Sequence, residues 1–119
     1  MIKNKDLVLK KQPTLKDFQQ YVSDLEKARG FTKSTVLEQC LRLGEEVGEL
    51  FKAIRKNENL KVDKNSKFGS IPEEIVDCFI FLLAISNKYG IDLEQAFRDK
   101  EEINKKREWK VIKTKKKTK

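Results

Sequence analysis

The sequence predicts an all-α protein, a four-helix bundle that assembles as an oligomer. Three observations lead to this prediction. Apolar residues recur every three or four positions through most of the chain, which is the spacing of one face of an α-helix. Ser, Thr or Asp stands before each such stretch, where it can cap the first helical turn. The 119 residues are enough for one domain, so all four helices should share one core.

The first expected helix covers residues 15–29. Thr14 is placed to cap its first turn, and Gly30 is placed to end it, because glycine readily adopts the left-handed conformation found after helices. Four apolar residues keep the helical spacing within this segment. They are Leu15, Phe18, Val22 and Leu25.

A second helix is expected from the cap at Thr35 to about Arg55. Thr35 and Glu38 match a capping box, in which each side chain bonds the backbone N–H of the other residue. The apolar stripe of this helix consists of Val36, Cys40, Leu43, Val47, Leu50 and Ile54. The polar, lysine-rich residues 57–69 that follow are expected to form a loop.

The third and fourth helices are expected at residues 71–89 and 93–108. Ser70 and Glu73 match a capping box, and Asp92 can cap the fourth helix. The run "CFIFLLAI" makes the third helix apolar on all sides, so we expect it to be buried on nearly every side. Three short helices of one chain are too few to cover it, which is why an oligomer is expected.

The cysteines and the apolar segments indicate the compartment. Cys40 and Cys78 stand among apolar residues and are expected to be reduced core thiols, since the chain has no CxxC pair and no histidine for a zinc site. The N-terminal stretch lacks the apolar core of a secretory signal. The longest apolar run, residues 78–85, is too short to span a bilayer. We therefore expect a cytoplasmic protein without membrane contact.

The net charge of +8 comes from the C-terminal end. Nine of the 27 basic residues but only one of the 19 acidic residues lie in residues 105–119, so the preceding part is electrically balanced. We expect one domain over residues 1–109 and a basic, disordered tail over residues 110–119. A balanced domain makes nucleic acid an improbable partner. The alternative function is a non-enzymatic helical interaction module whose tail touches nucleic acid.

Two pairs of acids stand beside the apolar stripes. In "GEEVGELFKAIR", residues 44–55, Glu46 and Glu49 are three residues apart and flank the stripe of the second helix, whereas Glu45 points further round. Glu74 and Asp77 repeat this spacing just before the apolar run of the third helix. Two antiparallel helices can bring such pairs face to face.

Carboxylates at the edge of a core need to be neutralised, because an unpaired buried charge is very unfavourable. Basic side chains are one answer. A divalent cation that prefers oxygen ligands, Mg²⁺ with Mn²⁺ as the alternative ion, is the other. The same pattern also occurs on ordinary solvated helix faces, so the residue types alone leave both interpretations open.

Three segments resemble a known family. "LGEEVGELFKAIRK", "EEIVDCFIFLLAISNKYGIDLEQAF" and "KEEINKKREW", within residues 33–109, are similar to the MazG-like nucleotide pyrophosphohydrolases of the all-α NTP pyrophosphatase superfamily. The signature of that family is EExxE, a spacer, then ExxD. Here it reads Glu45-Glu46-x-x-Glu49 followed by Glu74-x-x-Asp77. Trp109 departs from the family pattern, which often has Tyr followed by Pro at that place.

The resemblance implies hydrolysis of a nucleoside triphosphate to the monophosphate and pyrophosphate, and a dimer or tetramer with sites near subunit contacts. It implies that Mg²⁺ is held by Glu46, Glu49, Glu74 and Asp77. Glu45 and Glu49 are the implied catalytic residues, with Glu45 as the extra acid of the motif. In the fourth helix, the residues implied to meet the nucleotide and its phosphates are Lys100, Asn104 and Arg107. The base and sugar preferred by the enzyme do not follow from the resemblance.

Overall fold

The computed structural model describes residues 2–113, which contain helices and no strand. The elements are a short 3-10 helix η1 (Asn4–Asp6) and four α-helices, α1 (Leu15–Arg29), α2 (Val36–Asn57), α3 (Ile71–Lys88) and α4 (Leu93–Lys105). The all-α class and the four helices are thus confirmed. The helices end within three residues of the expected positions.

The first two helices begin at the capping boxes that the sequence predicts. The hydroxyl of Thr14 accepts the N–H of Asp17 at 3.2 Å, and the Asp17 carboxylate accepts the N–H of Thr14 at 2.9 Å. Thr35 and Glu38 form the same reciprocal pair. Gly30 ends α1 in the left-handed conformation, at φ 77°. Local side-chain chemistry therefore sets these boundaries.

The later caps are simpler than expected. The hydroxyl of Ser70 accepts the N–H of Glu73 at 3.4 Å, but the Glu73 carboxylate accepts from that hydroxyl rather than from the Ser70 backbone. The capping box expected here is therefore only half formed. Asp92 caps α4 by accepting the N–H of Gln95 at 3.3 Å.

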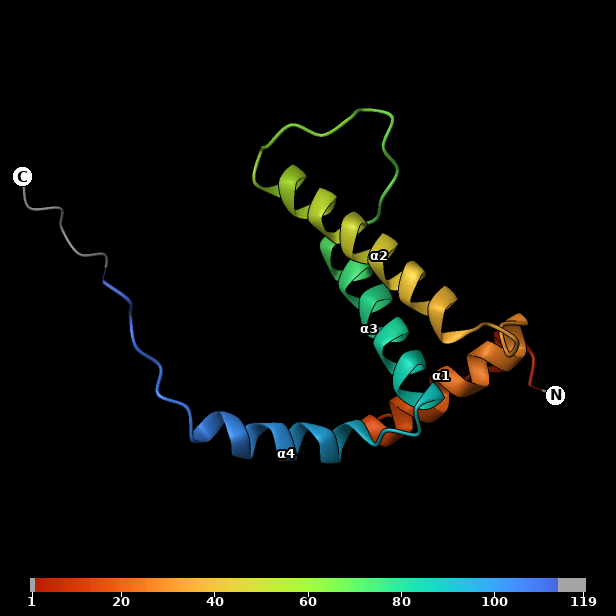
Figure 1. The fold of residues 1–119 in the computed structure, drawn as a ribbon. Helices are drawn as coiled ribbons and strands as arrows, with labels where there is room; N and C mark the ends of the chain where they lie inside the picture. Colours follow the sequence, from red (N-terminus) through yellow and green to blue (C-terminus); the bar gives the residue numbers. More distant parts are fainter. Residues whose placement is uncertain (1, 114–119) are drawn as a thin grey trace, which may run out of the picture.

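Two helices form the body of the chain. Figure 1 shows α2 and α3 side by side and antiparallel, joined by the long loop between them, with α1 across the far end of α3 and α4 leading away. The closest packing is between α2 and α3 and between α1 and α3. The buried core lies where α1 meets α3, and its members are Val22, Leu25, Leu83 and Ala84. The rings of Phe18 and Phe79 pack edge to face beside it, with centroids 5.6 Å apart.

A partly buried polar cluster fixes the turn between α3 and α4 against α1. We call it the Gln19 cluster and define it as Gln19, Asn87 and the backbone of Ile91 and Leu93. The Gln19 amide donates to Asn87 Oδ1 at 3.1 Å and to the Ile91 carbonyl at 2.7 Å. Its Oε1 accepts the N–H of Leu93 at 3.2 Å, and Asn87 donates to the Gln19 carbonyl at 2.8 Å. The first residue of α4 is thereby attached to α1.

The four helices do not close into a bundle within one chain, which corrects the expected arrangement. α4 packs chiefly on α1 and has no buried residue. α3 was expected to be buried on nearly every side, but Ile75 and Val76 are each 51% exposed and Leu82 is 49% exposed. The physical reason is that only α1 and α2 cover α3, which leaves its remaining faces in solvent.

The two cysteines are free thiols, but only one of them is near the core. Cys78 is half-buried on α3, whereas Cys40 is exposed on α2. The expectation of a buried Cys40 was wrong, because the face of α2 that meets α3 is centred on its neighbour Gln39 and on Ala53. Among the described residues, no helix is long and apolar enough to cross a membrane. The expected tail falls largely on residues 114–119, outside the described part of the chain.

Candidate metal and nucleotide site

The acids of α2 and α3 meet at the interface between these two helices. Glu46 of α2 and Glu74 and Asp77 of α3 each offer a carboxylate oxygen within 4.8 Å of the other two. We call these three residues the acid cluster. The ExxE and ExxD pairs face each other because α2 and α3 are antiparallel (Figure 1). Glu49 is half-buried one turn further along α2, and Glu45 is exposed.

Two buried oxygens of the acid cluster have no hydrogen-bond partner. Glu74 is only 3% exposed; its Oε1 accepts the N–H of Gly69 at 2.6 Å, but its Oε2 has no partner. Glu46 Oε2 is likewise buried and unpaired. The ion pairs found within the described residues all involve other acids. Basic side chains within residues 2–113 therefore do not neutralise this cluster.

The pKa values of the carboxyl groups in and beside the acid cluster reflect their burial and their closeness to one another. Burial, followed by the charges of Glu49 and Asp77, raises the pKa of Glu46 from its ordinary 4.5 to about 7. Burial and then the charge of Glu74 raise the pKa of Asp77. The pKa of Glu49 is also raised, first by burial and then by its contact with the Glu74 carboxyl. Burial and the neighbouring carboxylates thus both oppose ionisation of these groups.

The donor set fits a hard divalent cation. Carboxylate oxygens are the ligands that Mg²⁺ and Mn²⁺ prefer, and the site offers no nitrogen or exposed thiolate that would select a softer metal. A cation would also satisfy the unpaired oxygens of Glu46 and Glu74 and relieve the repulsion. The acid cluster is therefore compatible with metal binding.

Gly69 positions Glu74 and was missed by the sequence reasoning. Its N–H holds Glu74 Oε1, and a Cβ built on Gly69 would lie 2.9 Å from that oxygen and 3.0 Å from Glu73 Oε2. A larger residue would push the Glu74 carboxylate away. A glycine directly before the N-cap Ser70 was the available signal, because a residue without a side chain allows the backbone to approach the first helical turn closely.

The residues expected on the fourth helix lie away from the acid cluster. Lys100 is exposed on α4, and Asn104 is half-buried and donates to Glu101 at 3.1 Å. Arg107 was expected within the helix but lies beyond its end. The N–H groups of Lys106 and Arg107 bond carbonyls three residues back, which tightens and ends the last turn. The single chain does not bring these three residues to the carboxylates.

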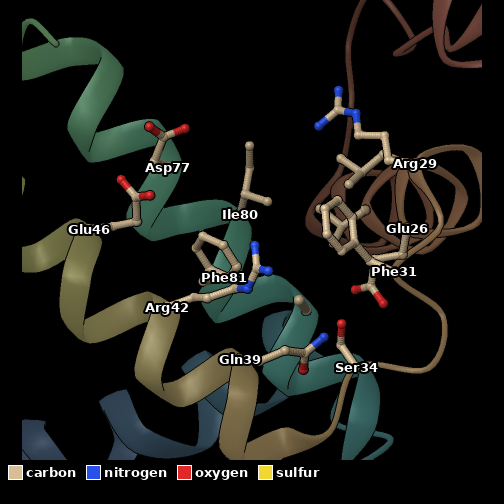
Figure 2. Close-up of a pocket in the computed structure, with 13 residues that line it drawn as sticks. Glu26, Arg29, Phe31, Ser34, Gln39, Arg42, Glu46, Asp77, Ile80 and Phe81 are labelled. Atoms are coloured by element: carbon tan, nitrogen blue, oxygen red, sulfur yellow. The ribbon is translucent and has the colours of Figure 1, made fainter. Parts of the chain in front are cut away.

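A cavity of about 230 Å³ opens directly beside the acid cluster, between α1, the segment 30–35, α2 and α3. Glu46 and Asp77 belong to both the cluster and the cavity wall. Figure 2 shows the other polar residues around the cavity, among them Glu26 and Arg29 from α1 and Arg42 from α2. The Arg42 guanidinium lies 5.1 Å from the ring centroid of Phe31. Burial raises the pKa of Glu26.

Gln39 is the most buried polar residue of this wall, at 3% exposed, and its Oε1 has no hydrogen-bond partner. Gln39 is not among the site residues expected from the sequence. Gln39 and Glu46 are seven residues apart, so about two helical turns place them on the same face of α2, together with Ala53. That spacing was the signal that could have identified Gln39.

Comparison with known proteins identifies the family. No curated protein matches the chain. The model of the MazG nucleotide pyrophosphohydrolase domain matches residues 31–112, which include the whole acid cluster, Gln39 and α4 but not α1. Because the match covers well over half of the 119 residues, the chain belongs to the MazG nucleotide pyrophosphohydrolase family.

Proposed function

We propose that this protein hydrolyses a nucleoside triphosphate to the monophosphate and pyrophosphate, with Mg²⁺, or alternatively Mn²⁺, as the required ion. The observation that carries the proposal is the acid cluster, in which buried oxygens of Glu46 and Glu74 lack partners. Their position in a chain of this family supports a nucleotide as the substrate. A triphosphate brings about four negative charges, which could not approach these acids without a cation.

The four acids of α2 and α3 would hold the ion. Glu46, Glu74 and Asp77 already converge, and Glu49 lies one helical turn from Glu46, in contact with the Glu74 carboxyl. When bound, Mg²⁺ supplies positive charge that polarises phosphate oxygens and eases ionisation of the attacking water. Glu45 and Glu49 are the proposed catalytic acids.

Lys100, Asn104 and Arg107 are proposed to contact the substrate from outside the α2–α3 pair. Because α4 leads away from the acid cluster of its own chain (Figure 1), these residues fit a site completed by a second copy. A dimer or tetramer would also cover the exposed apolar residues of α2 and α3. These include Leu41, Phe51, Ile75, Val76 and Leu82. Light scattering at micromolar concentration tests the oligomer directly.

The decisive experiment measures pyrophosphate release from a panel of ribo- and deoxyribonucleoside triphosphates, with Mg²⁺ and with EDTA. We expect release from at least one triphosphate with Mg²⁺ and none with EDTA. Release of orthophosphate in place of pyrophosphate would show that the terminal phosphate is removed, and would contradict the proposed cleavage between the α- and β-phosphates. No release under any condition, combined with salt-sensitive retention on nucleic acid, would favour the non-enzymatic module instead.

A further inference from the structure

The cavity beside the acid cluster has the properties of a recognition site. It is lined by Glu46 and Asp77 at one side, so a molecule whose phosphates lie at the carboxylates would extend into it. The rest of the wall is largely apolar and includes Leu25, Ile80 and Phe81. A concave apolar site with a few polar groups is the usual form of a small-molecule pocket.

The charges of the wall disfavour phosphate within the cavity itself. Three acids, Glu26, Glu46 and Asp77, are balanced by only two cations, Arg29 and Arg42. Arg42 is moreover engaged with the ring of Phe31. The uncharged end of a nucleotide therefore suits this space better than its phosphates.

Flat side chains make the cavity suitable for a heterocycle. Phe31, with the Arg42 guanidinium 5.1 Å from its centroid, provides one planar surface. Phe81 and Ile80 contribute apolar surface from α3 (Figure 2). Aromatic rings and guanidinium planes stack on nucleobases irrespective of base identity. Stacking would therefore hold a base without selecting it.

Selection requires hydrogen bonds, and Gln39 is placed to make them. Gln39 is only 3% exposed, and its Oε1 has no hydrogen-bond partner among the residues that the structure describes. Figure 2 shows its amide at the same end of the cavity as the Ser34 hydroxyl and the Glu26 carboxylate. Leaving a buried amide oxygen unpaired is unfavourable, so the position is best explained by a ligand that donates to it.

We propose that this cavity binds the nucleobase of the substrate, and that Gln39 selects a base carrying an exocyclic amino group beside an unprotonated ring nitrogen, as cytosine and adenine do. The amino group donates to Gln39 Oε1, and the ring nitrogen accepts from Gln39 Nε2. This two-bond pairing is the one that a glutamine amide makes with adenine in nucleic-acid recognition. The proposal rests on the proposed function, which places the phosphates at the acid cluster.

The surroundings of Gln39 favour this base edge over its oxo counterpart. An amide can rotate to pair with uracil or hypoxanthine, which present a carbonyl and a ring N–H. The Glu26 carboxylate at the same end of the cavity offers only acceptors when ionised. It would attract a second amino proton and repel a carbonyl oxygen. Glu26 belongs to α1, outside the residues matched by the family model, so this contribution comes from the chain's own N-terminal part.

The test compares ligands that differ only in amino versus oxo substitution, CMP with UMP and AMP with IMP. Binding is measured in millimolar Mg²⁺, by titration calorimetry and by the side-chain amide resonances of ¹⁵N-labelled protein. We expect wild type to prefer CMP and AMP by roughly five- to 150-fold, the range for one two-bond contact. The Gln39 resonances, assigned as those missing in Gln39→Met, should shift with saturation.

Gln39→Met keeps the side-chain length and removes the hydrogen bonds, so the preference should fall below about twofold. Gln20→Met, which changes an exposed glutamine on the outer side of α1, should keep it. Equal binding of amino and oxo ligands by wild type, or a preference that survives Gln39→Met, would overturn the base assignment. So would ligands that fail to bind or that leave the Gln39 resonances unmoved.

The two proposals can fail separately. Values of kcat/KM for CTP, UTP, ATP and ITP with Mg²⁺ are measured on the same three proteins. Pyrophosphate release without any amino preference overturns the base site and leaves the proposed function standing. The reverse result, amino-selective binding of monophosphates without pyrophosphate release, overturns the proposed function and leaves the base site standing.

Discussion

Two glutamines of this chain are almost equally buried but differ in the hydrogen bonding of their side-chain amides. Gln19 is 8% exposed, and its amide makes three hydrogen bonds, to Asn87, Ile91 and Leu93. Gln39 is 3% exposed and its Oε1 makes none. The first lies between α1 and the α3–α4 turn, and the second lies in a cavity beside the acid cluster.

This difference separates a structural polar group from one that awaits a ligand. A buried polar group with all its partners stabilises one arrangement of the chain, and removing it leaves other groups unpaired. A buried polar group without partners opposes folding, and its presence has to be explained by something that binds. By this criterion the Gln19 cluster holds the fold, whereas Gln39, Glu46 and Glu74 form the part that the chain leaves incomplete.

The largest effect is expected at the acid cluster. Glu46→Gln removes one of the crowded charges at nearly constant shape, so the metal-free variant should melt at a higher temperature than wild type. In millimolar Mg²⁺, wild type should gain roughly 2.7 kcal/mol if the ion is at 100 times its Kd. The variant should gain little. Pyrophosphate release should fall by more than the roughly 10–100-fold typical of losing an outer partner of a metal ligand.

Thermal melts of wild type and Glu46→Gln, in EDTA and in Mg²⁺, measure these differences in stability. Turnover is measured on the same proteins. Glu58→Gln is the matched control, because Glu58 is an exposed glutamate just after α2 and is not part of the acid cluster. It should leave the Mg²⁺-induced shift and turnover as in wild type. If Mg²⁺ raises the melting temperature of Glu46→Gln as much as that of wild type, Glu46 does not hold the ion.

Replacing each of the two buried glutamines by methionine should change the stability of the fold in different directions. Gln19→Met leaves the Ile91 carbonyl, the Leu93 N–H and the Asn87 amide oxygen with an unsatisfied bond, which should destabilise the fold by about 2 kcal/mol or more. Gln39→Met removes an oxygen that had no partner, so stability should stay level or rise by about 1 kcal/mol. Urea unfolding of both variants in EDTA measures this difference. Equal losses at the two sites would contradict the distinction drawn between them.

The acid cluster and the Gln19 cluster also differ in how much of each could be predicted from the sequence. Thr14 and Thr35 act within one turn of themselves, so their caps were predicted correctly. Glu46 and Asp77 were selected from spacing along single helices, and the antiparallel pair then brought them together. The direction of α4, in contrast, depends on bonds such as that between Gln19 and Leu93, which are 74 residues apart. No local pattern in the sequence encodes such a contact.

The burial of α2 is a second feature that local sequence patterns did not predict. Helical spacing gave an apolar stripe through Cys40, yet α3 packs on the neighbouring face that carries Gln39 and Ala53. Glutamine is usually a surface residue, so composition argues against choosing it as part of a buried wall. Which side of an amphipathic helix meets its neighbour is decided by that neighbour, and part of the apolar surface of α2 stays exposed in the single chain.

A smaller effect is expected from Gly69→Ala, which tests whether backbone support matters to the acid cluster. The added methyl group would crowd Glu74 Oε1, so the carboxylate should turn away from the Gly69 N–H. We expect the Mg²⁺ concentration that gives half of the maximal melting shift to rise about tenfold, as for loss of an outer partner. Gly44→Ala is the control, because nothing lies within 4 Å of its added Cβ. An unchanged Mg²⁺ midpoint in Gly69→Ala would show that Glu74 needs no such support.

The smallest effect is expected from pH, and its sign follows from the acid cluster. The pKa of Glu46 is raised from 4.5 to about 7 by burial and by Glu49 and Asp77, so the folded chain holds this proton more tightly than the unfolded chain. The metal-free fold therefore loses stability as pH rises from about 4.5 to about 7 and does not regain it above that range. Asp77 and Glu49, whose pKa values are also raised, act in the same direction.

In EDTA we therefore expect a melting temperature several degrees lower at pH 8 than at pH 5.5, and a smaller fall in Glu46→Gln because one of the titrating groups is gone. Saturating Mg²⁺ should reduce the fall in wild type, since the ion binds the ionised carboxylates that repel one another. Gln39→Met should keep the wild-type slope, because it changes no titrating group. Melting curves at a series of pH values measure all three slopes. A wild-type melting temperature that rises between pH 5.5 and pH 8 in EDTA would mean that the carboxylates are already neutralised within the chain, and the metal assignment would lose its physical basis.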